Sequence, residues 1–449
     1  MQSPTRRPVP AFLRPLVRFL ETEASGGVIL LACAILALII ANSPWGPAWY
    51  DFWHTHLTIG YGEYKLDYPL EWWVNDALMT LFFFVVGLEI KRELVKGELR
   101  DPKKAALPAA AALGGMVVPA LIFLSLQWGQ EGKRGWGIPM ATDIAFVVGV
   151  MALLGKRVPA GLKIFILSLA IVDDLGAVLV IAVAYTPETS LLALGLVGLG
   201  LLVVLAARFG GIRAFWFYFF LGGLIWLAMV ASKVHPTVAG VILGLMTPPV
   251  NMVGKKALIP LMDYVLGRLR EIPESDDMDE YGDEMMALVE AGRETLSPLD
   301  RLEQALHPWV AFGIMPLFAL ANAGVVLKPE YITSPLAIAV ALGLFIGKPV
   351  GILLFSWVAV KAGIARLPVG VTMPVLLGGG CLAGIGFTMA LFITALAFDP
   401  NVIGSYELLD KGKTGTLAGS VFSAIVGVIL LWFFMPKLYK PAEGSTARA

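Results

Sequence analysis

The chain has 449 residues, of which 57% are hydrophobic and 15% are charged, and its mean hydropathy is +0.77. Globular proteins carry about 25% charged residues, so this composition excludes a set of soluble domains and predicts a polytopic membrane protein. Basic and acidic residues number 34 each, so no net charge favours nucleic acid as a partner. Two cysteines, Cys33 and Cys381, and four histidines give neither a disulfide framework nor a zinc-site spacing.

Repeated apolar runs predict an all-α bundle of about twelve transmembrane helices, since about 20 apolar residues cross a bilayer as a helix. The predicted segments are 26–43, 72–95, 105–127, 138–153, 160–185, 190–207, 213–231, 234–250, 305–327, 334–360, 370–398 and 414–436. The first is retained rather than cleaved as a signal peptide, because its apolar run continues past Cys33 to Ala41 without a small-residue cleavage site.

The segments divide the chain into five parts. These are a cytoplasmic N-terminal segment 1–25, helices one to eight in 26–250, a cytoplasmic acidic loop 251–304, helices nine to twelve in 305–436 and a cytoplasmic tail 437–449. Lys and Arg are enriched in cytoplasmic connections of membrane proteins. With a cytoplasmic N-terminus, that side holds 26 of the 34 basic residues, which places both termini in the cytoplasm.

Two connections stand out. Residues 44–70 are rich in aromatic residues and place Gly60-Tyr61-Gly62 between the β-prone runs 57–59 and 64–66, which predicts a small external β-hairpin. The cytoplasmic loop holds eleven acidic residues and one Arg between Glu271 and Asp300. It is either a solvated linker with an amphipathic stretch or a regulatory, ion-concentrating arm.

An adjacent carboxylate pair, Asp173 and Asp174, lies near the middle of an otherwise uncharged apolar run from Ile164 to Tyr185. Ionisable groups at that depth usually face cavities or partners along ion and proton pathways. The two side chains are about 100° apart around a helix, so they can border one cavity, and their titrations would be coupled. A hard cation bound by carboxylate and hydroxyl oxygens would then compete with protons. The alternative is a structural pair locked in a salt bridge.

Glycine and proline interrupt two segments. The fourth breaks around Gly137-Ile138-Pro139, and the eleventh carries 378–380 and then Gly384-Ile385-Gly386. Each is the middle segment of a three-segment block, and the two blocks begin on opposite sides of the membrane. This pattern predicts inverted repeats whose two broken helices cross at the midplane and mark a binding site. The spacing Gly240-x-x-x-Gly244, by contrast, predicts close helix packing.

Three polar residues accompany these features. Asp143 follows the first break and can compensate the positive ends of facing half-helices, while Thr142 can supply a neutral oxygen ligand. The alternative for Asp143 is a local helix cap. Lys348 is the only basic residue deep within a predicted segment, and it either balances the acids, faces helix C-termini at the broken eleventh segment, or snorkels from a helix end.

Other ionisable residues lie near segment ends. Asp76 lies close to the start of the second segment, where capping is as plausible as function. Glu89 and Arg92 end that segment, and Glu303 and His307 open the ninth on the same side. Because histidine titrates near neutral pH, these four residues form either a pH-sensing cluster or ordinary surface pairs.

Several motifs together resemble the NhaA family of bacterial sodium/proton antiporters. They are Asn75-Asp76-Ala77-Leu78-Met79, Val86-Gly87-Leu88-Glu89-Ile90-Lys91-Arg92-Glu93-Leu94, Ala141-Thr142-Asp143, Val172-Asp173-Asp174-Leu175-Gly176, Leu306-His307-Pro308-Trp309-Val310, Ala321-Asn322-Ala323-Gly324-Val325, Gly347-Lys348-Pro349 and Gly384-Ile385-Gly386-Phe387-Thr388-Met389. The resemblance runs from about residue 15 to residue 436.

The resemblance implies a secondary transporter rather than an enzyme, without a cofactor, in the bacterial cytoplasmic membrane. It implies electrogenic, pH-regulated exchange of internal Na⁺ or Li⁺ for external protons by alternating access. The implied ion and proton site is Asp173 and Asp174, with Thr142 and Asp143 at the helix crossing. Lys348 is implied in charge compensation or in an ion pair with the first aspartate.

The same resemblance implies a pH-response cluster of Glu89, Arg92, Glu303 and His307, a pathway role for Asp76 and a homodimer formed through the 44–70 hairpin. Gln304 stands where one family member has a second histidine, and the acidic loop is longer than usual for the family. His235 lies in a family-like context, but Pro236 follows it.

Three rival classes remain at this stage. An intramembrane aspartyl protease would need two acids on separate helices, such as Asp143 and Asp173, and peptide cleavage would reveal it. A cation channel would carry current without proton coupling. A carrier of organic solutes would show competition that Na⁺ and Li⁺ alone do not produce.

Overall fold

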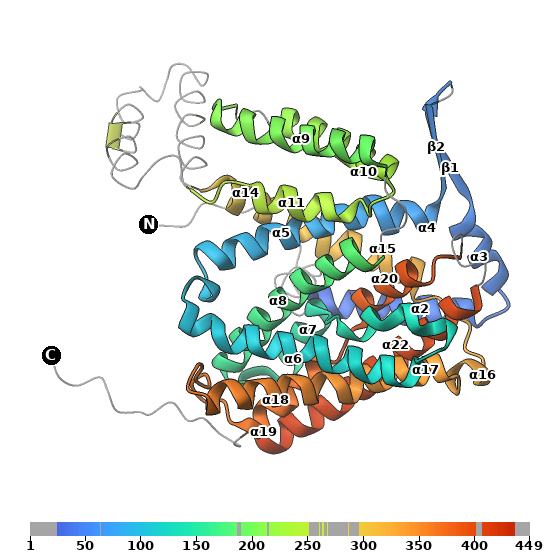
Figure 1. Ribbon diagram of the computed structural model, residues 1–449, viewed down its shortest axis with the longest axis vertical. Helices are drawn as coiled ribbons and strands as arrows, with labels where there is room; N and C mark the ends of the chain where they lie inside the picture. The colour runs from blue at the N-terminus through green and yellow to red at the C-terminus, as the bar shows by residue number, and fades with distance from the viewer. Residues whose placement is uncertain are drawn as a thin grey trace, which may run out of the picture.

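The computed structural model describes residues 25–62, 64–185, 190–212, 215–250, 296–400 and 406–435, with single positions between 251 and 295. Within these ranges the chain is almost entirely helical, with one small sheet (Figure 1). The predicted segment 1–25 falls outside the described residues except for Ser25, as do the tail 437–449 and most of the acidic loop.

The first half of the chain contains α2 (Ser25–Ala41), α3 (Gly46–His54), β1 (His56–Tyr61), β2 (Tyr64–Pro69), α4 (Leu70–Trp72), η1 (Trp73–Leu78), α5 (Met79–Val95), η2 (Glu98–Arg100), α6 (Pro102–Gln127), η3 (Glu131–Met140), α7 (Ile144–Leu154), η4 (Gly155–Arg157), α8 (Ala160–Ala184), α9 (Leu191–Phe209), α10 (Phe215–Ser232) and α11 (Thr237–Met246). The second half contains α14 (Pro298–Trp309), η5 (Val310–Ile314), α15 (Met315–Asn322), α16 (Pro329–Ile332), α17 (Pro335–Leu342), η6 (Gly343–Gly347), α18 (Lys348–Lys361), α19 (Met373–Ala383), α20 (Phe387–Ala397) and α22 (Tyr406–Phe434).

Every predicted segment coincides with one to three consecutive helical elements, but the count of twelve stays a prediction. Among the described residues, seven helices are long and apolar enough to cross a membrane, or up to ten if each bent pair is one span. The helices α10 and α11 are apolar but shorter. The ninth and twelfth helical stretches also begin earlier than predicted, at Pro298 and Tyr406, because charged residues can occupy the polar ends of a membrane helix.

Both predicted interruptions are present. The axes of η3 and α7 bend by 45° at residues 141–143, and those of α19 and α20 bend by 48° at 384–386. A third bend of 114° separates α2 from α3. The sequence analysis did not predict that third bend, although Pro47 in the first turn of α3 marks a new helix start.

The hairpin pairs β1 with β2 in antiparallel register, from His56 opposite Pro69 to Tyr61 opposite Tyr64. Pairing therefore continues through Gly60 and Tyr61, which were predicted to form the turn, and the turn lies after them at Gly62, whose φ is +63°. Asp67 accepts a hydrogen bond from Thr58, and its contacts with Thr58 and His56 lower the pKa of its carboxyl. In Figure 1 the hairpin projects from one end of the bundle beside α3.

Glycine allows the closest helix contacts. A Cβ at Gly114 of α6 would collide with the carbonyl of Gly351 on α18, and one at Gly351 would collide with the carbonyl of Gly114. In the same way Gly240 and Gly244 of α11 meet the backbone of α5, which confirms the predicted packing role of that spacing.

The bundle has a main core and two satellite cores. Buried residues of α2, α5 to α8, α15 and α17 to α22 form one continuous apolar cluster. Residues of α9, α10 and α11 share a second one, and Val86, Ile90 and Ile171 form a third between α5 and α8. In Figure 1, α9 to α11 lie at one side and α18 and α19 at the other, with α7 and α20 between them. The two interruptions are therefore enclosed by protein, as unwound backbone in a membrane requires.

We expect Gly351→Ala to destabilise the protein by about 1–3 kcal/mol, because the added methyl must push α6 and α18 apart. Thermal unfolding of the detergent-solubilised protein, followed by tryptophan fluorescence, measures this. The matched control is Gly198→Ala on α9, where a Cβ meets no atom within 4 Å. Equal melting temperatures for Gly351→Ala and the parent would contradict this account of the packing.

Candidate functional site

One carboxylate joins the two broken helices. The Asp143 side chain caps α7 by accepting a hydrogen bond from the Phe146 amide at 3.0 Å. Its other oxygen accepts from the amide of Thr388 at 3.1 Å and from the Thr388 hydroxyl at 2.5 Å, within the first turn of α20. The Asp143 amide also donates to the Ile385 carbonyl at 2.7 Å. Asp143 thus faces the positive ends of two half-helices, as predicted, and it is a local cap as well.

Thr142 connects this crossing to the carboxylate pair. Its hydroxyl lies 2.8 Å from Asp173 Oδ2 and 2.8 Å from the carbonyl of Ala383, the last residue of α19. A hydroxyl carries one hydrogen, so it can donate to only one of these oxygens at a time. An ionised Asp173 can accept from Thr142. A protonated Asp173 can instead donate to Thr142, which then donates to Ala383.

Lys348 completes the site from the other side. Its ammonium lies 2.6 Å from Asp173 Oδ2, and it also donates to the carbonyl of Met140, the last residue of η3. The side chain is fully buried, which excludes snorkelling to the interface. The predicted helix C-terminus is therefore present, but it belongs to the fourth segment rather than the eleventh. The positive charge faces both the acid and the negative end of a half-helix.

The direction of Lys348 is set by the wide π-helical turn η6 that precedes it. Its first and last residues, Gly343 and Gly347, pack directly on Pro139 and Pro119, where a side chain would collide. The glycines therefore bring α6 and η3 close to the backbone that carries the lysine. Such π-helical turns occur frequently at functional sites.

Two oxygens of the carboxylate pair keep their capacity to accept. Asp173 and Asp174 are 1% and 2% exposed, and Oδ1 of each has no hydrogen-bond partner among the described residues. Buried polar atoms are nearly always partnered, and the exceptions often have a chemical role. An ionised carboxylate only accepts, so both atoms suit a proton or a cation. No group of three or more His, Cys, Asp or Glu side chains in the described ranges could hold a metal ion.

A second group of charged side chains extends from this pair to the C-terminal end of α5, which is the end far from the hairpin. Glu89 is close enough to Asp174 to interact with it electrostatically, and in turn it interacts with Arg92 and Glu303. Arg92 and Glu303 form a direct ion pair between α5 and α14. His307 lies one turn further along α14, exposed to solvent, and its charge acts on Glu303. All four predicted pH-response residues therefore gather, with Glu89 nearest the site.

Asp76 lies in the π-helical turn η1 at the hairpin end of α5, where it is largely buried and senses the charge of Asp399. The structure therefore keeps it apart from the cluster around Glu89. His235 contacts the Tyr185 carbonyl through Nε2 at 3.1 Å. An imidazole in this position donates from Nε2 in its neutral form.

Sequence reasoning missed several polar contacts. Thr388 lies in the quoted eleventh-segment motif, yet its bond to Asp143 was not predicted. Asn75 and Asn322 exchange side-chain hydrogen bonds between η1 and α15. The Tyr185 hydroxyl accepts from the Gly137 amide and donates to the Arg134 carbonyl, which ties the end of α8 to η3. The signal for the asparagines was their presence in two of the family motifs.

These features define a multi-pass helical membrane protein with buried ionisable side chains at the meeting point of two broken helices. Comparison with known proteins also indicates a membrane protein of this class. The model of the family described as Na⁺/H⁺ antiporter 1 matches residues 17–431.

Among similar proteins, the Na(+)/H(+) antiporter NhaA of Rhodopirellula baltica is 49% identical over 437 residues, covering 96% of both chains. The NhaA of Rhizobium meliloti is 48% identical over 426 residues, covering 95% of this chain and 96% of the relative. The NhaA 2 of Vibrio vulnificus is 46% identical over 421 residues, covering 94% of this chain and 93% of the relative. The chain belongs to the Na⁺/H⁺ antiporter 1 family, and the predicted resemblance to NhaA is confirmed.

We expect Lys348→Met to destabilise the protein by about 3–5 kcal/mol, because it leaves the buried Asp173 without its cation. The double variant Asp173→Asn/Lys348→Met should regain much of that loss, since both members of the ion pair are then uncharged. Denaturant unfolding in detergent measures both. Lys361→Met, at the exposed end of the same helix, is the control and should change stability by about 1 kcal/mol or less. A double variant no more stable than Lys348→Met would contradict the ion-pair account.

Proposed function

We propose that this protein is an electrogenic, pH-regulated antiporter that exports Na⁺ or Li⁺ in exchange for external protons. The observation that carries the proposal is that two buried carboxylate oxygens, Asp173 Oδ1 and Asp174 Oδ1, have no hydrogen-bond partner in the described part of the chain, beside Thr142. Carboxylate and hydroxyl oxygens suit a small hard cation. Protons and Na⁺ would therefore compete for one site.

The exchange follows from this competition. When Na⁺ binds from the cytoplasm, both carboxylates are ionised and their protons leave to that side. When protons load from outside, Asp173 and Asp174 become neutral acids and Na⁺ departs. With two protons exchanged per Na⁺, each cycle moves one positive charge inward, and a membrane potential that is negative inside drives it. No cofactor is needed for this cycle.

The surrounding groups have defined parts in the proposed cycle. Lys348 offsets the charge of Asp173 while that acid is ionised, and it keeps the Met140 carbonyl as a partner when the acid is neutral. Thr142 redirects its one hydrogen from Asp173 to Ala383 on the same change. Asp143 keeps the broken helices together in both states, which suits a unit that rocks between two membrane faces.

We also propose the membrane arrangement that the basic residues predict, with both termini on the cytoplasmic side of the bacterial inner membrane. The hairpin end is then external and the end with Arg92 and Glu303 is cytoplasmic. Asp76 would border the external part of the pathway. The two three-segment blocks would form inverted repeats that cross at the midplane.

The hairpin is the proposed dimer contact. The residues of β1 are exposed, Leu57 and Ile59 among them, and the free edges of a two-stranded sheet can pair with a second copy. Light scattering should report a dimer for the parent protein in detergent and a monomer after residues 56–69 are replaced by a short flexible linker.

Asp173→Asn and Asp174→Asn should each reduce Na⁺-triggered proton release to the background of vesicles without the protein. Each substitution removes one of the two ionisable groups for which the ions compete. Everted vesicles with a pH-sensitive dye measure this on addition of Na⁺, Li⁺ or K⁺. Asp67→Asn, on the hairpin and far along the chain from the site, is the matched control and should exchange normally. Normal exchange by both site variants would refute the assignment.

Glu303→Gln and Arg92→Gln should shift the pH midpoint of exchange in opposite directions, by about half a unit or more. Glu303→Gln removes a negative charge near Glu89, so Glu89 releases its proton more easily and exchange is activated at lower pH. Removing positive charge does the reverse. The control is Lys104→Gln, which breaks an exposed pair with Glu98 on η2 outside this cluster. Unchanged midpoints, or shifts in the same direction, would exclude the proposed pH response.

A further inference from the structure

A polar recess lies at the hairpin end of the bundle, where the end of α6 and the starts of η3, α17 and α22 meet. Its volume is about 260 Å³, and its lining includes Gln127, Glu131, Leu336 and Lys411. None of these residues takes part in the proposed ion site. The recess is therefore a separate feature of the molecule.

Gln127 is the unusual member of this lining. The side chain is 1% exposed, and its Nε2 has no hydrogen-bond partner among the described residues. A buried amide that donates to nothing is costly, so an acceptor is expected there. Gly132 packs closely against this side chain, because a Cβ at this position would lie 2.5 Å from Gln127 Oε1 and 3.0 Å from Leu336.

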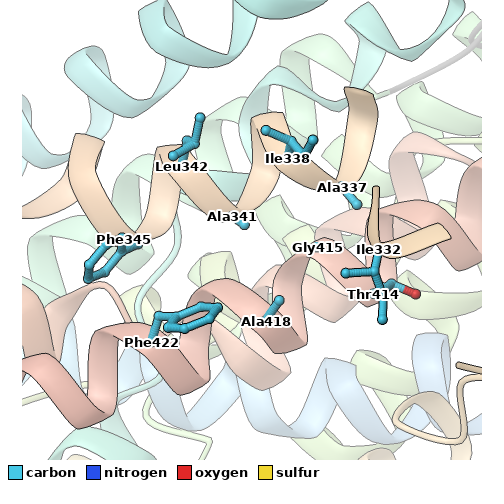
Figure 2. A pocket seen from close by; sticks show the side chains of 10 residues that line it. All are labelled: Ile332, Ala337, Ile338, Ala341, Leu342, Phe345, Thr414, Gly415, Ala418 and Phe422. Atoms are coloured by element: carbon cyan, nitrogen blue, oxygen red, sulfur yellow. The ribbon is translucent and has the colours of Figure 1, made fainter. Parts of the chain in front are cut away.

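An apolar groove lies next to the recess along the same two helices. It has a volume of about 310 Å³ and runs between α17 and α22 (Figure 2). Phe345 and Phe422 close one end with ring centroids 6.0 Å apart, Ala341 and Ala418 form the middle, and Thr414 lies at the other end (Figure 2). Thr414 of the groove follows Lys411 of the recess by one helical turn, so the two cavities succeed one another along α22.

The charges of the recess define the occupant. Lys411 and the Gln127 amide are donors that suit a phosphate. Glu131 also lines the recess, and Lys411 already pairs with Glu407 at 2.5 Å, so the region holds both signs of charge. A lipid with net negative charge would meet these two carboxylates. A headgroup that adds an ammonium to its phosphate complements both.

We propose that the groove and recess bind one phospholipid with a phosphoethanolamine headgroup. One acyl chain lies between α17 and α22, the phosphate faces Lys411 and Gln127, and the ammonium faces Glu131. Choline carries no N–H and donates no hydrogen bond to a carboxylate, so it fits less well. The bound lipid spans the contact of α17 and α22, where Gly415 packs directly on the backbone of Ala337.

The test uses the full-length protein, purified in detergent and depleted of lipid. Dioleoyl lipids with ethanolamine, choline or glycerol headgroups are added in turn, and melting temperature and native mass spectrometry report binding. The ethanolamine lipid should raise the melting temperature saturably and leave one retained adduct. Its half-saturating concentration should be about tenfold below that of the glycerol lipid. Equal stabilisation by all three headgroups would overturn the proposal.

Variants separate the two parts of the site. Gln127→Leu and Lys411→Gln should each raise the half-saturating concentration of the ethanolamine lipid about tenfold. Ala418→Phe fills the groove and should remove the retained adduct. The matched controls are Val421→Phe, an exposed position on the same helix outside the groove, and Lys328→Gln, an exposed lysine that does not line the recess.

The melting temperature without lipid identifies any variant that fails to fold. If Gln127→Leu fails to fold, Lys411→Gln still tests the headgroup contacts, because Lys411 is partly exposed and its substitution should not disturb the core. Parent-like binding by folded Lys411→Gln and Ala418→Phe would overturn the proposal.

Discussion

The structure depends on one carboxylate placed where two helices begin. Each start leaves backbone amides unpaired and carries partial positive charge, and in the interior of a membrane protein water does not satisfy them. Asp143 accepts from Phe146 at one start and from Thr388 at the other. This arrangement fixes the unwound stretch 141–143 against 384–386. The residues of the proposed ion site are positioned relative to that stretch.

The helix ends that point the other way are complemented in turn. Lys348 donates to the terminal carbonyl of η3, and Thr142 lies within reach of the terminal carbonyl of α19. Both side chains also contact Asp173 Oδ2. The acid therefore shares its partners with the backbone of the broken helices. A change in its protonation redistributes hydrogen bonds at two helix ends, which gives a local chemical event a direct mechanical connection to the crossing.

The buried charges and the two helix breaks could be predicted, because each depends on residues that are close together in the sequence. Charge inside an apolar run located Asp173, Asp174 and Lys348, and clustered glycine and proline located both breaks. What could not be predicted depends on pairing across the chain. Nothing near residue 388 in sequence identifies Asp143 as its partner, and nothing local identifies Asn322 as the partner of Asn75. One of the three alternatives for Lys348 placed the carbonyl that it faces on the eleventh segment instead of the fourth, for the same reason. The hairpin turn was misplaced because Gly60 is compatible with a strand as well as a turn.

The wide turn η6 has a consequence for how the lysine is aimed. A π-helical turn contains one residue more than an α-helical turn, so it rotates all that follows by about 100° relative to an uninterrupted helix. The ammonium of Lys348 reaches Asp173 from that rotated position. The π-helical turn thus determines the direction from which the ammonium approaches Asp173, through the backbone rather than through the lysine side chain. If the same residues closed into ordinary α-helical turns, the ammonium would swing away from the acid while the composition of the site stayed the same.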